Sequence, residues 1–212
     1  LKTGEVIPVD LSSDIFNVEH VKYLEDANFP KVSGIIINGL NKDVTNMRVN
    51  SIAFDETGTI IGGGYTYLNF LPANGQTGVE MTIKSTSIPA KIEIFPSLSS
   101  LSELEGADKQ DSSVELIAQG FGVQNRELGV AFLIRNKDPR NTIKGTKYQI
   151  AAYDQAGGVL DTDSGYINFI FPEQITAGFA SLYPPEGSTV ARVDIQIKPG
   201  KISTSPITNN PF

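Results

Sequence analysis

One stretch of this chain occurs twice. Residues 53–70 (AFDETGTIIGGGYTYLNF) recur 99 positions later as residues 152–169 (AYDQAGGVLDTDSGYINF). Six of these 18 positions are identical, and several others exchange similar residues, such as Phe54 for Tyr153. Shared residue types at a shared spacing are typical of an internal repeat. The sequence therefore predicts two copies of one small domain, each long enough to enclose a modest core of its own.

Both copies consist of short runs of β-branched and aromatic residues separated by turn signals. Residues 32–38 (VSGIIIN) form the clearest predicted strand, and residues 130–136 (VAFLIRN) match them at an offset of 98. Asp55 to Gly58 predicts a hairpin turn, since aspartate can bond its own backbone and glycine accepts a positive φ. No segment of ten or more residues has a helical period, which predicts an all-β chain. The other expected strands are 16–23, 47–54, 59–61, 65–70, 79–83 and 90–95 in the first copy, and 114–123, 147–153, 166–171, 175–182 and 190–197 in the second.

The predicted strands divide the chain into two domains and three connecting or terminal segments. Residues 16–96 and 114–198 are the two predicted β-sandwiches. Residues 97–113, rich in Ser, Glu and Asp, are predicted to link them, and three leucines at spacing three there could form one helical turn. Residues 1–15 are expected to be a lead-in segment and residues 199–212 a flexible tail.

The composition excludes several classes of partner and site. A net charge of −7 argues against nucleic acid, whose phosphates require a basic face, and against an anionic membrane surface. The absence of cysteine removes disulfides, thiolate metal sites and cysteine nucleophiles. No apolar run approaches the length of a membrane-spanning helix. The chain begins at Leu1 rather than Met, so we expect a segment upstream, such as a signal peptide or an anchor.

The turn motif of each copy resembles a known family. Residues 53–55 (AFD) with Gly58, and residues 152–154 (AYD) with Gly157, are similar to the bacterial FxLYD-type domain. Residues 134–139 (IRNKDP) also resemble the late-embryogenesis-abundant type of β-sandwich. The resemblance implies two tandem immunoglobulin- or fibronectin-III-like antiparallel β-sandwiches of a prokaryotic envelope protein, lipoprotein or secreted protein. It implies an extracytoplasmic location and no enzyme role.

The sequence contains no constellation that predicts catalysis. His20 is the only histidine, and no nucleophile-elbow motif accompanies it, so we interpret it as a structural or surface residue. Nothing singles out a carboxylate pair for glycoside hydrolysis among the 24 acidic residues. We therefore predict that the protein is not an enzyme and has no catalytic residues.

Two short motifs partly match a metal or cofactor site but lack residues that such a site requires. Residues 161–165 (DTDSG) resemble the opening of a calcium loop, but Tyr166 and Pro172 stand where such a loop needs Gly and Glu. We interpret this stretch, with Asp161 and Asp163, as a solvated loop between two strands. Residues 62–64 (GGG) lack the Lys-Ser/Thr and the helix of a phosphate loop, which favours a bulge or loosened edge. No metal and no cofactor are predicted.

The aromatic residues that both copies share are the remaining candidates. Tyr67 and Phe70, like Tyr166 and Phe169, are three apart in a strand and so point to opposite faces. We expect one of each pair in a core and the other outside. An exposed pair of Tyr65 and Tyr67 on one edge would favour a binding surface.

The pattern as a whole predicts a non-enzymatic extracytoplasmic module for spacing or for protein–protein contact at the cell surface. Its partner would be a protein or a cell-envelope component, and an exposed edge strand could receive it. The alternative is a small-ligand or carbohydrate-binding module that uses exposed tyrosines or the groove between the domains.

Overall fold

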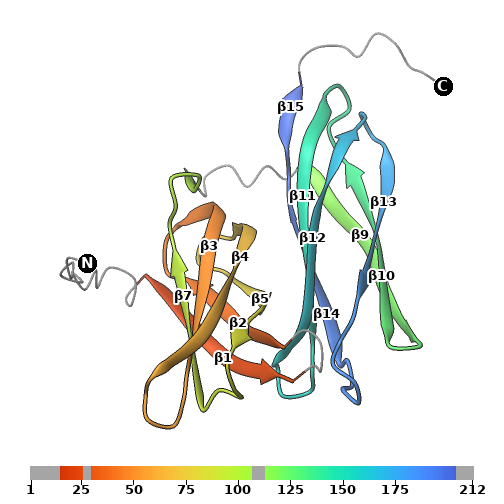
Figure 1. The fold of residues 1–212 in the computed structure, drawn as a ribbon. Coiled ribbons are helices and arrows are strands. Elements are labelled where there is room, and N and C mark those ends of the chain that lie inside the picture. Colours follow the sequence, from red (N-terminus) through yellow and green to blue (C-terminus); the bar gives the residue numbers. More distant parts are fainter. Residues whose placement is uncertain (1–14, 26–29, 107–112, 204–212) are drawn as a thin grey trace.

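The computed structural model describes residues 15–25, 30–106 and 113–203, which form strands and turns and no helix (Figure 1). This confirms the predicted all-β class. The strands of the first half are β1 (Phe16–Leu24), β2 (Lys31–Asn38), β3 (Lys42–Phe54), β4 (Ile60–Leu71), β5 (Gln76–Thr82), β6 (Lys84–Ser85), β7 (Lys91–Ser97) and β8 (Glu103–Gly106). Those of the second half are β9 (Val114–Gln124), β10 (Glu127–Asn136), β11 (Thr142–Tyr153), β12 (Val159–Ile170), β13 (Ile175–Leu182), β14 (Arg192–Lys198) and β15 (Lys201–Ser203).

These strands form four antiparallel sheets. In the first half, sheet A has the order β1-β2-β5, and sheet B has the order β6-β4-β3-β7 with β8 also paired to β3. In the second half, sheet C has the order β13-β10-β9, and sheet D has the order β12-β11-β14 with β15 also paired to β11. The order β4-β3-β7 thus recurs as β12-β11-β14, and β1-β2-β5 recurs as β9-β10-β13. Each half is a sandwich of two sheets.

Each sandwich encloses its own hydrophobic core. The first core lies between sheets A and B, and the second between sheets C and D. The first contains Phe16, Val32, Ile36, Val44, Met47, Val49, Ala53, Leu68, Leu71, Val79, Met81, Ile83 and Ile94. The second contains Leu128, Val130, Phe132, Ile134, Ile150, Ala152, Ile170, Ala180, Leu182 and Val193. Alternate residues of each strand point into these cores, as the two-residue period of a strand requires.

A third buried cluster joins the two halves. Ile35 and Ile37 of sheet A pack against Ala151, Tyr153 and Val159 of sheet D. The four sheets are therefore layered in the order B, A, D, C, and part of each of sheets A and D is covered on both faces. Strands buried on both faces carry continuous apolar runs rather than alternating ones. This explains the run of buried residues in β2, whereas β10 alternates between buried positions and positions that are partly or fully exposed.

The repeated hairpin turn forms as predicted in both halves. The amide of Gly58 donates to the carbonyl of Asp55 at 3.1 Å, and that of Gly157 donates to the carbonyl of Asp154 at 3.1 Å. Both glycines have φ near +80° (83° and 81°), a conformation that a residue with a Cβ rarely adopts. A register shift follows each turn, between Ala53 and Phe54 and between Ala152 and Tyr153.

Two stretches predicted as loops or interruptions are regular strand. The prediction of a solvated loop at residues 161–165 is wrong, because β12 runs through them and Asp161 is buried. β4 likewise runs through Gly62–Gly64 without a break, and the bulge lies at the adjoining register shift. A Cβ at Gly63 or Gly64 would clash with the backbone of Ser51 or Thr82, so these glycines permit close approach of neighbouring strands.

The segments outside the two predicted sandwiches contain short strands. Within residues 97–113, Ser99–Ser102 makes a turn and β8 pairs with β3, and no helical turn forms at the leucines of the described part. Residues 107–112 lie outside the described residues. Within residues 199–212, β15 pairs with β11, and the predicted tail beyond it lies outside the described residues, as does most of the predicted lead-in.

Candidate functional surfaces at the junction and on the outer sheets

The centre of the junction between the halves is a buried network of amides. Gln149 of β11 donates through Nε2 to the carbonyl of Phe70 at 2.8 Å and to Oγ1 of Thr77 at 2.7 Å. Gln196 of β14 donates through Nε2 to the carbonyl of Gln76 at 2.7 Å. Buried hydrogen bonds of this kind are directional, so they hold the two sandwiches in one relative orientation.

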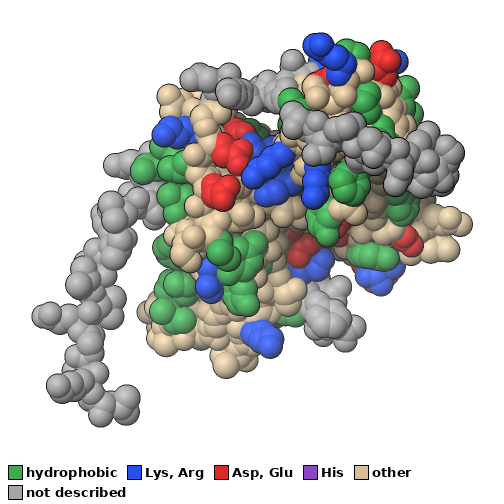
Figure 2. Space-filling model, turned by 90° about the horizontal axis from the view of Figure 1, so that it is seen from above, with side chains coloured by type: hydrophobic (Ala, Val, Ile, Leu, Met, Phe, Trp, Pro, Cys, Tyr) green, Lys and Arg blue, Asp and Glu red, His purple; other side chains and the backbone are tan. Residues whose placement is uncertain are grey.

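Ion pairs close both ends of the junction. At one end Nζ of Lys198 lies 2.5 Å from Oδ2 of Asp43 and 2.9 Å from Oε2 of Glu105. Figure 2 looks down on the molecule and shows basic and acidic side chains side by side between the halves. At the other end Nζ of Lys22 lies 2.5 Å from Oδ2 of Asp154, the aspartate of the second repeated turn. The junction is therefore apolar and amide-bonded in the middle and charged at its ends.

A third group of charges is more deeply buried. Nζ of Lys31 lies 2.9 Å from Oε2 of Glu80 and 3.4 Å from Oδ1 of Asp161. Burial, reinforced by a hydrogen bond and by repulsion from the Asp161 carboxylate, raises the pKa of Glu80 to about 8. Burial opposes the charge of Lys31, but its bonds to Glu80 and its attraction to Asp161 raise its pKa overall. The raised pKa favours the protonated form of Glu80, and Lys31 contacts both Glu80 and Asp161.

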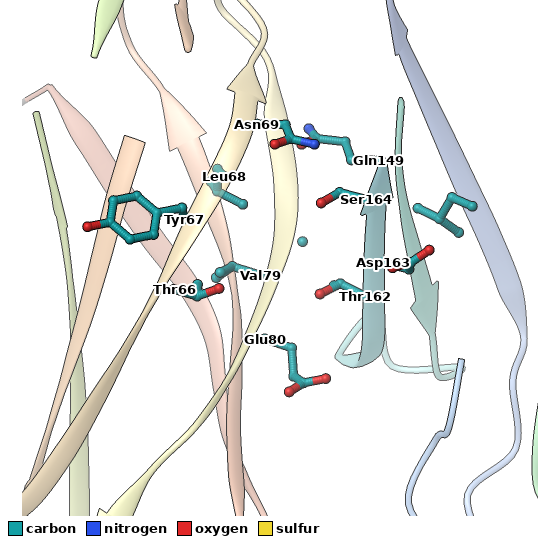
Figure 3. A pocket seen from close by; sticks show the side chains of 12 residues that line it. Thr66, Tyr67, Leu68, Asn69, Val79, Glu80, Gln149, Thr162, Asp163 and Ser164 are labelled. Atoms are coloured by element: carbon teal, nitrogen blue, oxygen red, sulfur yellow. The ribbon is translucent and has the colours of Figure 1, made fainter. Parts of the chain in front are cut away.

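A small polar cleft opens beside this group, with a volume of about 190 Å³ (Figure 3). In Figure 3 Glu80 points into the gap from sheet A, and Thr162 and Ser164 point into it from β12. The ring of Tyr67 and the carboxylate of Asp163 point away from it. Ligand pockets usually enclose about 300–1,000 Å³. The cleft is therefore small and polar, and it is not lined by an aromatic ring.

The side chains considered for catalysis and for metal binding, His20 and Asp161, lie on different sheets. His20 lies on β1 with φ of 52°, within the register shift that runs from Glu19 to Lys22, and it is exposed. The carboxylate of Asp161 accepts hydrogen bonds from the backbone amides of Thr162 and Tyr183, one at each oxygen. The described residues contain no group of three or more acidic or histidine side chains placed to hold a metal ion.

The repeated aromatic pairs have different surroundings in the two halves. Tyr67 is exposed as expected, whereas Phe70 is buried but is not part of the first core. In the second half Tyr166 and Phe169 are both exposed, so the expectation of one core residue is wrong there. Phe70 is buried because the second half lies beside it, as its bond to Gln149 shows, whereas Phe169 has no such neighbour among the described residues.

The outer face of sheet B is rich in exposed aromatic rings. Tyr65 and Tyr67 are 58% and 48% exposed and pack edge to face, with ring centroids 6.0 Å apart. The guanidinium of Arg48 lies 4.5 Å from the centre of the Tyr65 ring. Phe95, which is paired with Asn50 across β7 and β3, extends the same face. An exposed pair of these two tyrosines is the feature expected of a binding surface, and it lies on the open face of the stack.

The outer face of sheet C is also apolar, and it is hollowed. Leu133 of β10 and Phe179 of β13 are 40% and 63% exposed. A hollow of about 810 Å³ lies beside Phe179. It is lined by Gly120, Phe121, Gly122, Val123, Gln124, Asn125, Glu127, Gly129, Ala131 and Phe179. The two ends of the four-sheet stack thus both present apolar surface, of a kind that often marks an interaction site.

Comparison with known proteins identifies no family for this chain. No family model matches the sequence, and no curated protein matches it. Among solved structures, the chain is similar to red sea bream transglutaminase, with 12% identity and a TM-score of 0.30 over 86% of this chain and 29% of that chain. It is also similar to a β-glucuronidase from glycoside hydrolase family 2, with 10% identity and a TM-score of 0.26 over 81% of this chain and 22% of that chain. The chain spans less than a third of each of these proteins, and similarity at this level carries no inference about activity.

Among the described residues, none forms a helix with the length and apolar character that crossing a membrane requires.

Proposed function

We propose that this chain is a non-enzymatic interaction module, a rigid pair of β-sandwiches that contacts other proteins through the outer faces of its end sheets. The observation that carries the proposal is the pairing of a closely packed junction with two uncovered apolar faces. The buried contacts of Ile35 with Ala151 and Val159 hold the halves together. The faces that carry Tyr65 and Leu133 lie at opposite ends of the stack and remain open.

A rigid stack suits a protein that sets a distance or presents a surface. If the two halves moved freely on a linker, binding would have to fix their relative orientation. The loss of that freedom would weaken binding. The resemblance to FxLYD-type domains supports a place outside the cytoplasm, in a prokaryotic envelope or secreted protein. An upstream anchor would fit the same role.

Site-specific photo-crosslinking in cells tests the proposal. A photoreactive phenylalanine analogue replaces Leu133 on sheet C or Tyr67 on sheet B in the full-length protein, and the control position is Thr57 in the exposed hairpin turn. We expect a discrete protein adduct from one or both faces and none from the turn. Equal labelling at all three positions, or none at any, would overturn the proposal.

The tyrosine pair supports a second candidate, the binding of carbohydrate on sheet B. Tyr65 and Tyr67 present ring faces and edges to solvent, and Arg48 supplies hydrogen-bond donors beside them. Titration of the purified chain with oligosaccharides, followed by ¹H–¹⁵N spectra, tests this. Saturable shifts confined to β3 and β4 that disappear in Tyr65→Ala would support it, whereas no saturable shift would remove it.

A further inference from the structure

The two halves have matching sheets, which allows their surfaces to be compared residue by residue. Asn38 at the end of β2 donates to the carbonyls of Lys42 and Pro72, and Asn136 at the end of β10 donates to those of Asn141 and Phe171. The same side chain thus closes the same end of each sandwich. Because Asn38 and Asn136 are 98 positions apart, β10 matches β2 at an offset of 98, and sheet C is the counterpart of sheet A.

Sheets D and B match in the same way. Arg192 lies over the ring of Tyr153 at 3.8 Å and pairs with Asp194, while Lys91 lies 5.8 Å from the ring centre of Phe54 and pairs with Glu93. Both aromatic residues follow the repeated register shift. The outer face of sheet B is therefore the counterpart of the outer face of sheet D.

The junction within the chain joins two different faces. Sheet A contributes Ile35, and sheet D contributes Ala151 and Tyr153. An interface between unlike faces is heterologous, and it leaves one copy of each face unused. Here the unused faces are those of sheets C and B, at the two ends of the stack.

The unused faces retain the apolar character of the faces they match. On sheet C, Leu133 stands at the position of Ile35, and Phe179 replaces Glu80. On sheet B, Ile52 stands at the position of Ala151, and Phe54 stands at that of Tyr153. The buried Lys31–Glu80–Asp161 group of the junction thus has no charged counterpart at Phe179. An aromatic ring in place of a buried acidic side chain makes the sheet C face more apolar at this position than the face that is already covered.

One of the two faces is hollowed and the other carries exposed rings. The hollow on sheet C has a floor of small residues, including Gly120, Gly122 and Gly129. The opposite end of the stack carries the projecting rings of Tyr65 and Phe95. Glycine floors allow close approach of a partner surface, as Gly78 does at the junction.

We propose that the outer face of sheet B of one molecule packs on the outer face of sheet C of a second copy, head to tail, in the arrangement that joins D to A within the chain. This proposal rests on the proposed function. It assigns both end faces to one partner, a second copy of the chain. Because each contact leaves a B face and a C face free, the assembly grows as an open row of copies rather than a closed dimer.

Sedimentation velocity of the purified chain, from about 1 µM to 1 mM, tests the proposal. Wild type is expected to form a concentration-dependent series of species beyond the dimer. Leu133→Arg on sheet C and Ile52→Arg on sheet B should each weaken association by about tenfold or more, because each places a charge in the contact. Ile88→Arg is the control, since Ile88 lies in the loop before β7, outside the strands of both faces, and is 65% exposed. It should associate as wild type does.

Mixing the two face variants gives the decisive result. Leu133→Arg retains its B face and Ile52→Arg retains its C face, so an equimolar mixture should form heterodimers and nothing longer. A closed, symmetric dimer would show no such rescue and would overturn the proposal, as would a wild-type chain that stays monomeric throughout. If that monomer still formed a discrete adduct with another protein in the crosslinking experiment, the proposed function would stand and the head-to-tail contact alone would fail.

Discussion

Gly78 of β5 lies directly against Ala151 of β11, across the junction of the two halves. A Cβ built on Gly78 would lie 2.8 Å from the Cβ of Ala151 and 3.0 Å from Cγ2 of Val159. Both of these neighbours belong to the buried cluster that joins sheets A and D. The separation of the two sheets therefore depends on the absence of a side chain at this one position.

Replacing Gly78 with valine is expected to force the halves apart. Overpacking of a closed interface typically costs about 1–3 kcal/mol, and we expect a loss of about 2 kcal/mol from the free energy of unfolding. Urea denaturation measures the loss, and small-angle scattering should show a larger radius of gyration. The matched control is Ala177→Val, at the corresponding position of sheet C, where the side chain is exposed and the change should be small.

Replacing Glu80 with glutamine is expected to change how stability depends on pH. The pKa of Glu80 is raised to about 8 in the folded chain, above its ordinary value of 4.5, chiefly by burial. Between these values the folded state binds a proton that the unfolded state lacks. The free energy that Glu80 contributes to the stability of the folded state is therefore fully present below about pH 4.5. It is lost as the pH rises through about 8.

Wild type should accordingly lose about 2 kcal/mol more than Glu80→Gln between pH 5 and pH 9. Guanidinium titrations at both pH values give the difference. The exposed Glu115 on β9 supplies the control, as Glu115→Gln should follow wild type. Parallel pH dependence of Glu80→Gln and wild type would show that Glu80 is not protonated in the folded chain.

Asn38 and Asn136 are expected to be costly to remove. Nδ2 of Asn38 lies 2.9 Å from the carbonyl oxygens of Lys42 and Pro72, in a buried position. Substitution by alanine leaves buried carbonyls without donors, so we expect a loss of about 3 kcal/mol from either variant by urea denaturation. Asn168→Ala, on the exposed part of β12, is the control and should change stability by less than about 0.5 kcal/mol.

Lys198 is expected to stabilise the junction through charge. Its side chain is 15% exposed and pairs with Asp43 and Glu105, which raises its pKa even though burial opposes its charge. Lys198→Met retains most of the packing and should lower the unfolding free energy by about 1–2 kcal/mol, since it leaves two carboxylates unpaired. Thermal denaturation checks this, and Lys91→Met, at an exposed pair, should have little effect. A change no larger than that of Lys91→Met would show that the pair does not hold the junction.

The sequence predicted the elements far better than it predicted their burial. The alternation and turn signals around Asp55 and Gly58 located the hairpin, because those effects act within a few residues. Asp161 was misjudged, since its surroundings come from Lys31 and Tyr183, which are distant in sequence. One feature of the sequence does indicate which strand is buried on both faces. The unbroken apolar run of residues 32–38, against the alternating run of residues 130–136, marks a sheet covered on both faces.

By itself, the sequence determined the all-β class, most of the strand positions and the repeated turn, since strand period and turn chemistry depend on residues close together in the chain. Only the tertiary structure decided which face of each sheet is covered. Equivalent residues such as Phe70 and Phe169 differ in burial because the second half covers the first of them alone. The burial of a residue depends on the elements that pack against its strand. In two similar sandwiches, those elements are decided by which of the four outer sheet faces meet.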